Sequence, residues 1–299
     1  MFIPKFFRWG QCSFEDYQRA CNHFGYNCES APEFIAFKMR FGQSFDFYSY
    51  QRNGKTMGSV CVEKGWLAND GRHRQRSLPA LLAPSTSVYV PFCNEASKKV
   101  LLPFRCKSLH HLQRHRFLNT SYSLFSKSHA AFTKSPVADF SRKTVSTRER
   151  ELRKFLNDGG SFLNVSQLDG EHIFEVFEIL YQARRNQAIA ERAINKAFFR
   201  EFQPCFKGYM MFLHNEPVAL QLLLSVSSSA GMFVDFINIG YRIDSNAGAV
   251  GTMLMWKNLT ALYQEAAEKQ LPLHYSYGSM SGDYKNRWCH SVNNGRVII

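Results

Sequence analysis

The order of hydrophobic patterns in the second half of the chain constrains its fold more than any other feature. Apolar residues recur at helical spacing from about Leu168 and again over residues 191–202. The period then becomes that of strands over residues 206–213, 218–226 and 232–241, with polar turns between them. A glycine-containing loop leads into another helical pattern that ends near Lys269, and a last strand follows at 273–277. We therefore predict two helices, three antiparallel strands, a glycine loop, a helix and a strand, in an α/β fold.

The remaining segments predict further elements and a division into two domains. The sequence Ser146-Thr147-Arg148-Glu149 fits a capping box, and the helix that it opens should end at Gly159 and Gly160. Nearer the N-terminus we expect a helix over 14–24 capped by Ser13, a hairpin of 45–51 with 55–62 around Asn53-Gly54, and strands at 87–90 and 100–102. The Ser-, Thr- and Lys-rich stretch 120–145 is the expected connector. This gives domains over 1–140 and 141–299.

Composition narrows the class of protein. With 299 residues of which 45% are apolar, the chain can bury a substantial core. It has no apolar run of about 18 residues, and its N-terminus lacks the apolar region and cleavage site of a signal peptide. The eight cysteines form no CxxC pair, so we expect reduced thiols and no metal site. A cytoplasmic protein is the resulting expectation.

Positive charge is concentrated in the middle of the chain. Residues 98–154 carry 14 Lys and Arg against 3 Asp and Glu, a net charge of +11, whereas the whole chain carries +13. Such a field attracts an anionic membrane surface, a phosphorylated ligand or RNA. The alternative is a solvated face that only keeps the protein soluble. No sequence signature of a DNA-reading motif is present, so sequence-specific DNA binding is not expected.

The glycine loop is the first candidate binding site. Gly248 and Gly251 let the backbone approach a phosphate, and the amides that open the next helix are free donors at its positive end. We therefore predict that a cofactor phosphate contacts the loop residues, namely Asn246, Gly248, Ala249, Val250, Gly251 and Thr252. The loop lacks the Gly-Lys-Ser/Thr of a P-loop, and a tight turn without a ligand is the competing interpretation.

The element order together with this loop resembles the core of GNAT acyltransferases. In that fold the fourth strand splays from the fifth, and the loop after the fourth strand binds the pyrophosphate of coenzyme A. The tail contains a strand, Gly278 and the box Tyr284-Lys285-x-Arg287-Trp288-Cys289. This box resembles the Fem-like branch of the superfamily, and more closely the macrophage-inducible antimicrobial-peptide-resistance proteins of enteric bacteria.

The resemblance implies a fold, a location and a role. We expect two GNAT-like domains, each a mixed sheet flanked by helices, with the N-terminal one degenerate. It also implies a cytoplasmic protein held peripherally at the inner membrane, a virulence role in peptide resistance, and acyl-coenzyme A as a candidate cofactor. A non-catalytic peripheral membrane or regulatory protein that binds anions through its basic segment is the alternative to an N-acyltransferase or aminoacyltransferase.

Four side chains are the candidates for chemistry. Tyr284 follows the last strand, where a GNAT-like tyrosine protonates the leaving thiolate, but a structural tyrosine is the competing interpretation. Asp235 interrupts an apolar strand and is a candidate base for an amine. An ion pair of Asp235 with Arg242, Lys285 or Arg287 would explain it equally well. Lys285 and Arg287 are the expected substrate-binding residues.

Overall fold

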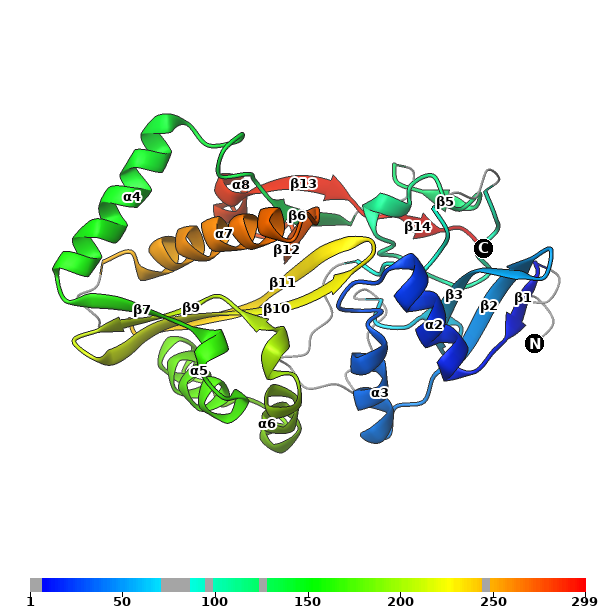
Figure 1. Cartoon of the computed structure of the whole chain (residues 1–299), viewed down its shortest axis with the longest axis horizontal. Coiled ribbons are helices and arrows are strands. Elements are labelled where there is room, and N and C mark those ends of the chain that lie inside the picture. The colour runs from blue at the N-terminus through cyan, green and yellow to red at the C-terminus, as the bar shows by residue number, and fades with distance from the viewer. Residues whose placement is uncertain (1–6, 71–86, 95–98, 124–127, 244–247) are drawn as a thin grey trace.

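The computed structural model describes residues 7–70, 87–94, 99–123, 128–243 and 248–299 (Figure 1). The first part of the chain contains these helices and strands in order: β1 (Trp9–Gln11), α2 (Phe14–Phe24), α3 (Pro32–Arg40), β2 (Asp46–Arg52), β3 (Lys55–Glu63), β4 (Trp66–Leu67), the short 3-10 helix η2 (His111–Gln113), β5 (Thr120–Ser121) and β6 (His129–Thr133).

The second part continues with a longer series. Its elements are α4 (Arg142–Asn157), β7 (Gly160–Asn164), η3 (Val165–Gln167), α5 (Gly170–Arg185), α6 (Arg192–Glu201), η4 (Gln203–Cys205), β8 (Phe206–Lys207), β9 (Tyr209–Leu213), β10 (Glu216–Ser228), β11 (Gly231–Tyr241), α7 (Val250–Glu268), β12 (Leu273–Ser279), α8 (Tyr284–Trp288), β13 (Cys289–Asn293) and β14 (Arg296–Val297). The element order predicted for this part is confirmed, because the apolar periods there reflect faces that are buried.

The first unit is a small antiparallel sheet in the order β1-β2-β3-β4. Helix α2 begins at a capping box, in which the Ser13 hydroxyl accepts from the Asp16 amide at 3.1 Å, as the sequence predicts. This helix packs on the face that carries Phe47 and Cys61. Irregular chain from 87–94 and 99–123 covers the other face with the side chains of Val88, Phe92, Val100, Leu102, Phe104 and Phe117.

Two of the expected strands in this irregular chain do not form. Val88 and Val100 each make an isolated bridge, to Leu109 and Phe117, instead of a ladder. Their side chains are buried, which produced the strand-like pattern, but Pro91 and Pro103 interrupt the backbone donors that a longer ladder needs.

The second unit is an eight-stranded mixed sheet. Its main order is β13-β6-β12-β11-β10-β9-β7, and β8 also pairs with β10. Helices α5 and α6 cover one face, whereas α7 and α4 cover the other (Figure 1). Only the pair β11–β12 is parallel among these neighbours, because α7 crosses over between the two strands.

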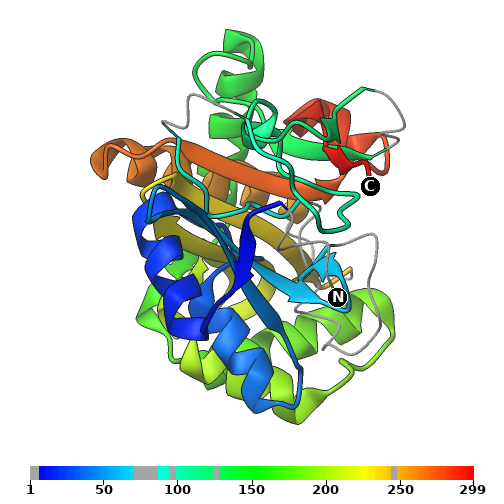
Figure 2. The same ribbon diagram turned by 90° about the vertical axis from the view of Figure 1, so that its right-hand side faces the viewer.

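Strand β6 ties the two parts of the chain together. It lies before residue 140 but pairs with β12 and β13, so a division at 140 separates β6 from its own sheet. Conversely, β14 lies after residue 140 but pairs with β5, and it places Val297 in the core of the first unit. Figure 2 shows the C-terminal end on the same side of the molecule as the first unit.

The start of α4 differs from the prediction. The helix begins at Arg142, where the Ser141 hydroxyl accepts from the Thr144 amide at 3.2 Å, and not at the Ser146 capping box. Both serines satisfy the sequence rule for a cap, and the earlier one is used because Phe140 and Val145 pack against the core with α7. The helix ends at Asn157, close to the predicted Gly159-Gly160 stop.

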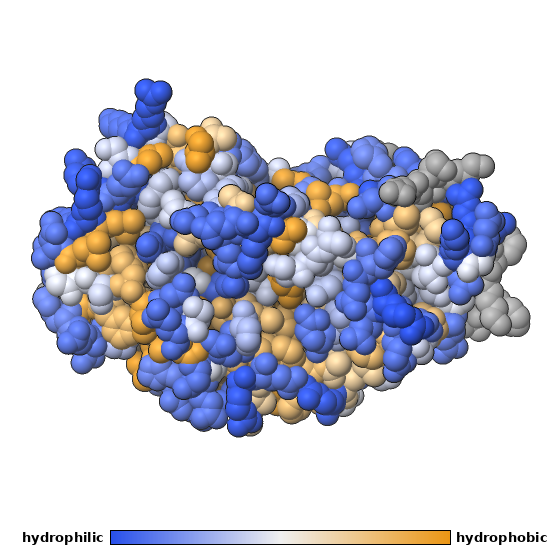
Figure 3. Space-filling model, viewed as in Figure 1, coloured by the Kyte–Doolittle hydropathy of each residue, from blue (hydrophilic) through white to orange (hydrophobic). Residues whose placement is uncertain are grey.

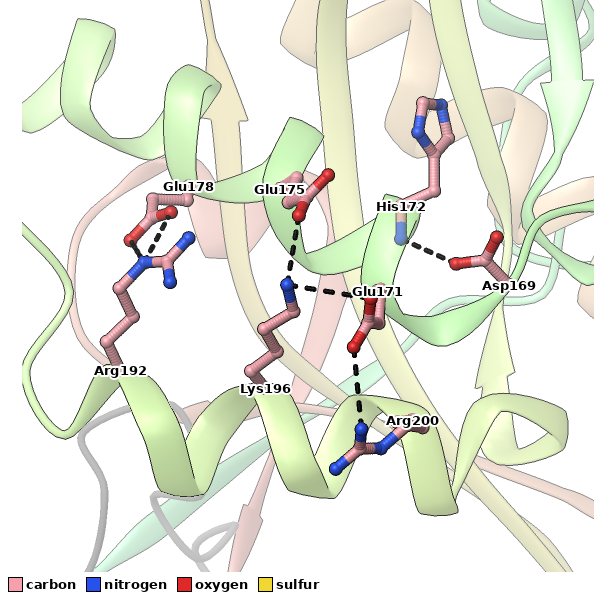
Figure 4. Close-up of polar contacts among 8 residues, drawn as sticks. All are labelled: Asp169, Glu171, His172, Glu175, Glu178, Arg192, Lys196 and Arg200. Atoms are coloured by element: carbon pink, nitrogen blue, oxygen red, sulfur yellow. Dashed lines mark hydrogen bonds and ion pairs between the residues drawn. The ribbon is translucent and has the colours of Figure 1, made fainter.

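A ladder of ion pairs holds α5 against α6 (Figure 4). Lys196 bonds Glu175 at 3.0 Å and Glu171 at 3.6 Å, and Arg192 lies 2.9 Å from Glu178. Beneath this ladder, Phe174 packs against Phe199 with ring centroids 5.2 Å apart. One exposed pair stabilises little, but a network along two helices fixes their alignment. It thereby places the C-terminal end of α5, which enters the site described next.

Candidate functional site

The parallel strands β11 and β12 separate partway along their length. Their ladder runs from Met232 paired with Leu273 to Asp235 paired with Ser276. Beyond this pair, β11 continues to Tyr241 and β12 continues to Ser279 without pairing to each other. Past this pair the facing backbone groups of the two strands are not paired with each other, and the Phe236 and Tyr277 rings pack together with centroids 4.9 Å apart. We call this place, where the ladder ends, the opening.

Irregularities in both strands produce this opening. In β11 the register against β10 shifts, since Leu222 pairs with Asn238 but Leu223 pairs with Phe236. Ile237 is the extra residue of this bulge, and a bulge bends and twists its strand. In β12, Gly278 has a φ of +77°, which turns the end of this strand toward β6.

Side chains bind part of the freed backbone. The carbonyl of Ile239 accepts from Arg184 Nη1 at 2.7 Å, and the Ile239 amide donates to Asn238 Oδ1 at 2.9 Å. Arg184 comes from the C-terminal end of α5, and its guanidinium also lies 4.9 Å from the centre of the Tyr241 ring. A cation is thus fixed at the open end of β11.

Tyr284 lies near this cation, at the start of α8. Its side chain is half exposed, and burial of the rest is the main reason that the pKa of the phenol is raised. Cys289 raises this pKa further, whereas Arg184 and Arg185 act in the opposite direction. Tyr284 therefore carries its proton at neutral pH and can donate it to a leaving group.

The two predicted substrate-binding residues have different environments. Lys285 is only 7% exposed, and its ammonium donates to the carbonyls of Tyr277 and Ser279, each at 2.6 Å. Burial lowers the pKa of Lys285. This side chain fixes the end of β12 and therefore shapes the opening. Arg287 is exposed.

Asp235 belongs to the other face of the sheet. Alternation along β11 puts it on the α5 side with Phe233, and its exposure is 7%. Burial, followed by the Asp235 carboxylate, raises the pKa of the Cys28 thiol, so this carboxylate lies beside a loop of the first unit. The structure thus gives the two candidate catalytic residues distinct environments: one is buried beside Cys28, the other is half exposed near Arg184.

The predicted phosphate loop leads to the first turn of α7. Gly248 has a φ of +72°, and Ala249 precedes the helix without a side-chain cap. The Val250 amide bonds the Gly248 carbonyl at 2.9 Å, while its side chain is buried in the core. Among the described residues no acceptor is found for the amides of Gly251 and Thr252. Asn246 lies outside the described residues.

The helix start also approaches the opening. A Cβ added at Gly251 would meet one atom, Ile239 Cδ1 at 3.9 Å, and Ile239 lies on β11 past the end of the ladder. On its outer side the helix start borders a pocket of about 440 Å³, which α4 and the β9–β10 turn close. Lys154 and His214 line this pocket, but so do Glu151 and Asp158. The acidic and basic side chains of the opposite wall therefore largely offset each other.

A series of hydrogen bonds between buried side chains connects the elements around the opening. The Gln221 side chain, fully buried in β10, donates to the Tyr275 hydroxyl at 3.0 Å and accepts from Asn258 Nδ2 at 2.8 Å. Asn258 in turn accepts from the Tyr209 amide at 2.8 Å. The series therefore joins β9, β10, α7 and β12. The candidate residues chosen from the sequence do not include the residues of this series. A glutamine inside the apolar stretch 218–226 is the signal that points to it, because such a group needs partners when it is buried.

Three further observations bear on the class of site. Among the described residues, no three His, Cys, Asp or Glu side chains are arranged to hold a metal ion. All eight cysteines are free thiols. None of the helices in the described ranges combines the length and the apolar character that crossing a bilayer requires.

Comparison with known proteins identifies relatives in sequence and in fold. Residues 32–297 match the family described as Mig-14, which confirms the resemblance that the tail box and the element order indicated. No curated protein sequence matches the chain. The crystal structure of FemX aligns with a TM-score of 0.56 and 10% identity over 97% of each chain. The structure of L-PGS from Bacillus licheniformis aligns with a TM-score of 0.53 and 9% identity, over 96% of this chain and 92% of that one.

At these identities the two structures establish a shared fold. The predicted α/β class is confirmed, and the fold is shared with FemX over nearly the whole chain. The expected mixed sheet is found in the second unit, whereas the pairs β1–β2, β2–β3 and β3–β4 of the first unit are all antiparallel, because hairpins and not crossover helices connect its longer strands. Fold alone does not fix a reaction, which depends on the residues of the site.

Proposed function

We propose that this chain, which belongs to the Mig-14 family, transfers an acyl or aminoacyl group from a thioester or an aminoacyl-tRNA to an amine. The observation that carries the proposal is the opening past Asp235 and Ser276, which has the start of α7 on one side and Tyr284 nearby. The Fem-like fold makes this the natural place for acyl transfer.

The start of α7 fits a phosphate group. The amides of Gly251 and Thr252 point along a helix of 19 residues, whose dipole favours an anion at this end. Gly248 has open space where a Cβ would stand, so nothing of its own blocks the approach. A bound acyl-coenzyme A or aminoacyl-tRNA would supply the activated acyl group. Gly248, Ala249, Val250, Gly251 and Thr252 would hold its phosphate.

Tyr284 is the residue to which we assign the proton transfer. As the amine nitrogen bonds to the acyl carbon, the bond to the leaving sulfur or oxygen breaks; the nitrogen releases one proton to solvent, and the leaving atom takes one from the Tyr284 hydroxyl. The raised pKa of Tyr284 keeps that proton available. The positive charge of Arg184 favours the phenolate that remains, which regains its proton from solvent. We assign no step to Asp235, since its burial beside Cys28 supports a structural role.

A non-catalytic role at an anionic membrane is the second candidate, and α4 supports it. This helix carries six Lys and Arg against two Glu, and five of these cations are exposed: Arg142, Lys143, Arg150, Arg153 and Lys154. Figure 3 shows hydrophilic side chains over α4 with apolar patches beside them. Leu156, which is 49% exposed, adds apolar surface at the end of this helix. Each basic residue near an anionic surface contributes about 1 kcal/mol.

The proposed cellular role follows from the family resemblance. We place the protein in the cytoplasm, attached peripherally to the inner membrane, where it would contribute to virulence through resistance to antimicrobial peptides. Deletion of the coding sequence should then sensitise the bacterium to cationic peptides, and only a chain with a working site should restore resistance. Restoration by a Tyr284→Phe chain would favour the non-catalytic candidate.

Thermal stability in the presence of ligands tests the transferase directly. We would screen coenzyme A, acyl thioesters and aminoacyl-tRNA, since a ligand at 100 times its Kd adds about 2.7 kcal/mol to the free energy of unfolding. Gly251→Val should abolish this gain, because its branched side chain covers the amides at the helix start. Gly251→Ala is the matched control, since the added Cβ meets only Ile239 at 3.9 Å. Equal stabilisation of both variants, with circular dichroism unchanged, would place the pocket elsewhere.

A further inference from the structure

A second pocket lies in the first unit, far along the chain from the glycine loop. Its volume is about 510 Å³, within the range of small-molecule sites. The charged side chains that line it are all cations, namely Arg105, Lys107 and Arg296. The indole of Trp66 and the side chain of Ile298 provide its apolar wall.

Three neighbouring backbone segments direct these side chains into the pocket. The Leu67 amide donates to the Arg105 carbonyl at 2.9 Å, and the Val297 amide donates to the Cys106 carbonyl at 2.8 Å. Cys106 and Val297 are buried in the core of the unit. Because side chains alternate along extended chain, Arg105 and Lys107 leave the core on the opposite side, as do Arg296 and Ile298.

The indole holds two of the cations in place. The Lys107 ammonium lies 5.1 Å and the Arg105 guanidinium 5.9 Å from the centre of the Trp66 ring. Cation–π attraction at these distances orders long side chains before a ligand arrives. Among the ion pairs between described residues, none involves Arg105, Lys107 or Arg296. The nearest described carboxylate, that of Asp70, accepts from the Lys107 backbone amide at 2.5 Å and from the Ser108 hydroxyl, so it offsets only part of the charge of these three cations.

We propose that this pocket, the cation pocket, binds an organic phosphate. Three cations match the charge of about −2 on a phosphomonoester, and an arginine fork suits phosphate oxygens. The volume exceeds that of a bare phosphate, and the Trp66 and Ile298 wall accommodates the organic part. The phosphate belongs either to a free small molecule or to the monoester headgroup of phosphatidic acid, since both present the same three terminal oxygens. A phosphate ligand would thus account for two basic residues of the segment 98–154, Arg105 and Lys107.

Binding of simple probes to the full-length chain tests the cation pocket. We would titrate glycerol 3-phosphate by calorimetry, with glycerol as the uncharged control, and measure binding to phosphatidylcholine vesicles with and without phosphatidic acid. Single-stranded RNA would be titrated in the same way. Glycerol 3-phosphate should bind and glycerol should not. Binding only to the phosphatidic acid vesicles would assign the phosphate to a lipid. Absence of binding to both phosphate probes, or binding confined to single-stranded RNA, overturns the proposal.

Matched variants show whether the binding occurs at this pocket. Arg105→Gln with Arg296→Gln removes two exposed cations and should weaken binding at least about tenfold, because each makes a charge-assisted hydrogen bond. Lys55→Gln with Lys99→Gln removes two exposed cations of the same unit outside the pocket and should bind like the wild type. An equal loss in both double variants overturns the proposal. If the first double variant does not fold, Lys107→Gln alone carries the test.

Discussion

A stacked pair of histidines at the seam between the two units predicts a loss of stability in mild acid. The rings of His110 and His111 are 4.4 Å apart and nearly parallel, and His274 from β12 lies 6.2 Å from His110. Burial is the main reason that the pKa of His111 falls to about 4 from 6.5, and proximity to His274 adds to it. The pKa values of His110 and His274 are also lowered, mainly by burial.

The size and sign of the effect follow from linkage. A lowered pKa means that the folded state holds His111 neutral, so its contribution to stability is complete above pH 6.5. As the pH falls below 6.5 the unfolded chain takes up a proton that the folded chain does not, and stability is lost until the pH reaches about 4. Integrated from pH 7.5 to pH 5.0, His111 alone costs about 2 kcal/mol. That is a large part of a typical stability of about 5–15 kcal/mol.

Denaturant unfolding at several pH values measures this loss. We would compare the wild type with His111→Phe, which keeps a ring against Phe132 and removes the titrating group. Nδ1 of His111 is buried and makes no hydrogen bond, so the substitution breaks none there. The variant should lose about 2 kcal/mol less than the wild type between pH 7.5 and 5.0. Exposed His115, changed to Gln, is the control and should leave the pH dependence unaltered. Identical pH curves for the wild type and His111→Phe would refute the assignment.

Three further predictions concern the site and the surface. Tyr284→Phe should lower turnover by about 10²-fold with little change in ligand affinity, because its proton is needed only as the leaving group departs; steady-state kinetics beside calorimetry test this, and unchanged turnover makes the residue structural. Lys285→Met should lower the free energy of unfolding by about 2 kcal/mol, since the carbonyls of Tyr277 and Ser279 lose a charged donor. An Arg287→Met control should leave stability nearly unchanged because that side chain is exposed, and equal losses in both would contradict the role given to Lys285. Vesicles with anionic lipid should bind the protein at low salt and release it at high salt, and binding that ignores salt would exclude attraction by the basic residues of α4.

The sequence predicts those parts of the fold whose cause is local. The strands β9, β10 and β11 and the helix α7 have apolar residues at a period that their own burial explains, so their order is recovered. Strand β6 is not predictable in this way, because its partners β12 and β13 follow it by more than 140 residues and its own five residues carry little pattern. The same holds for β14, whose partner lies near residue 120.

The candidate site shows the same limit at the level of side chains. The glycine loop and Tyr284 could be selected because backbone freedom and residue type are visible in a sequence. Whether a cation faces a substrate or its own backbone is decided by the fold: the adjacent Lys285 and Arg287 look equivalent, yet one bonds two carbonyls of β12 and the other is exposed. Arg184 is a site residue only because α5 ends beside the bulged part of β11.

The two anion sites proposed for this chain differ in the groups that would bind the anion, and this difference separates them by experiment. The start of α7 offers backbone amides and a helix dipole, with no Lys or Arg from Gly248 to Thr252. The cation pocket offers three side-chain charges near the surface. Raising the salt concentration should therefore weaken binding at the cation pocket steeply, because several charges take part, and weaken binding at the glycine loop much less. Substitutions should also separate the two sites. Gly251→Val should abolish binding at the glycine loop only, and Arg105→Gln with Arg296→Gln should weaken binding at the cation pocket only. If one variant abolished both kinds of binding, the chain would have a single anion site, and one of the two assignments would be wrong.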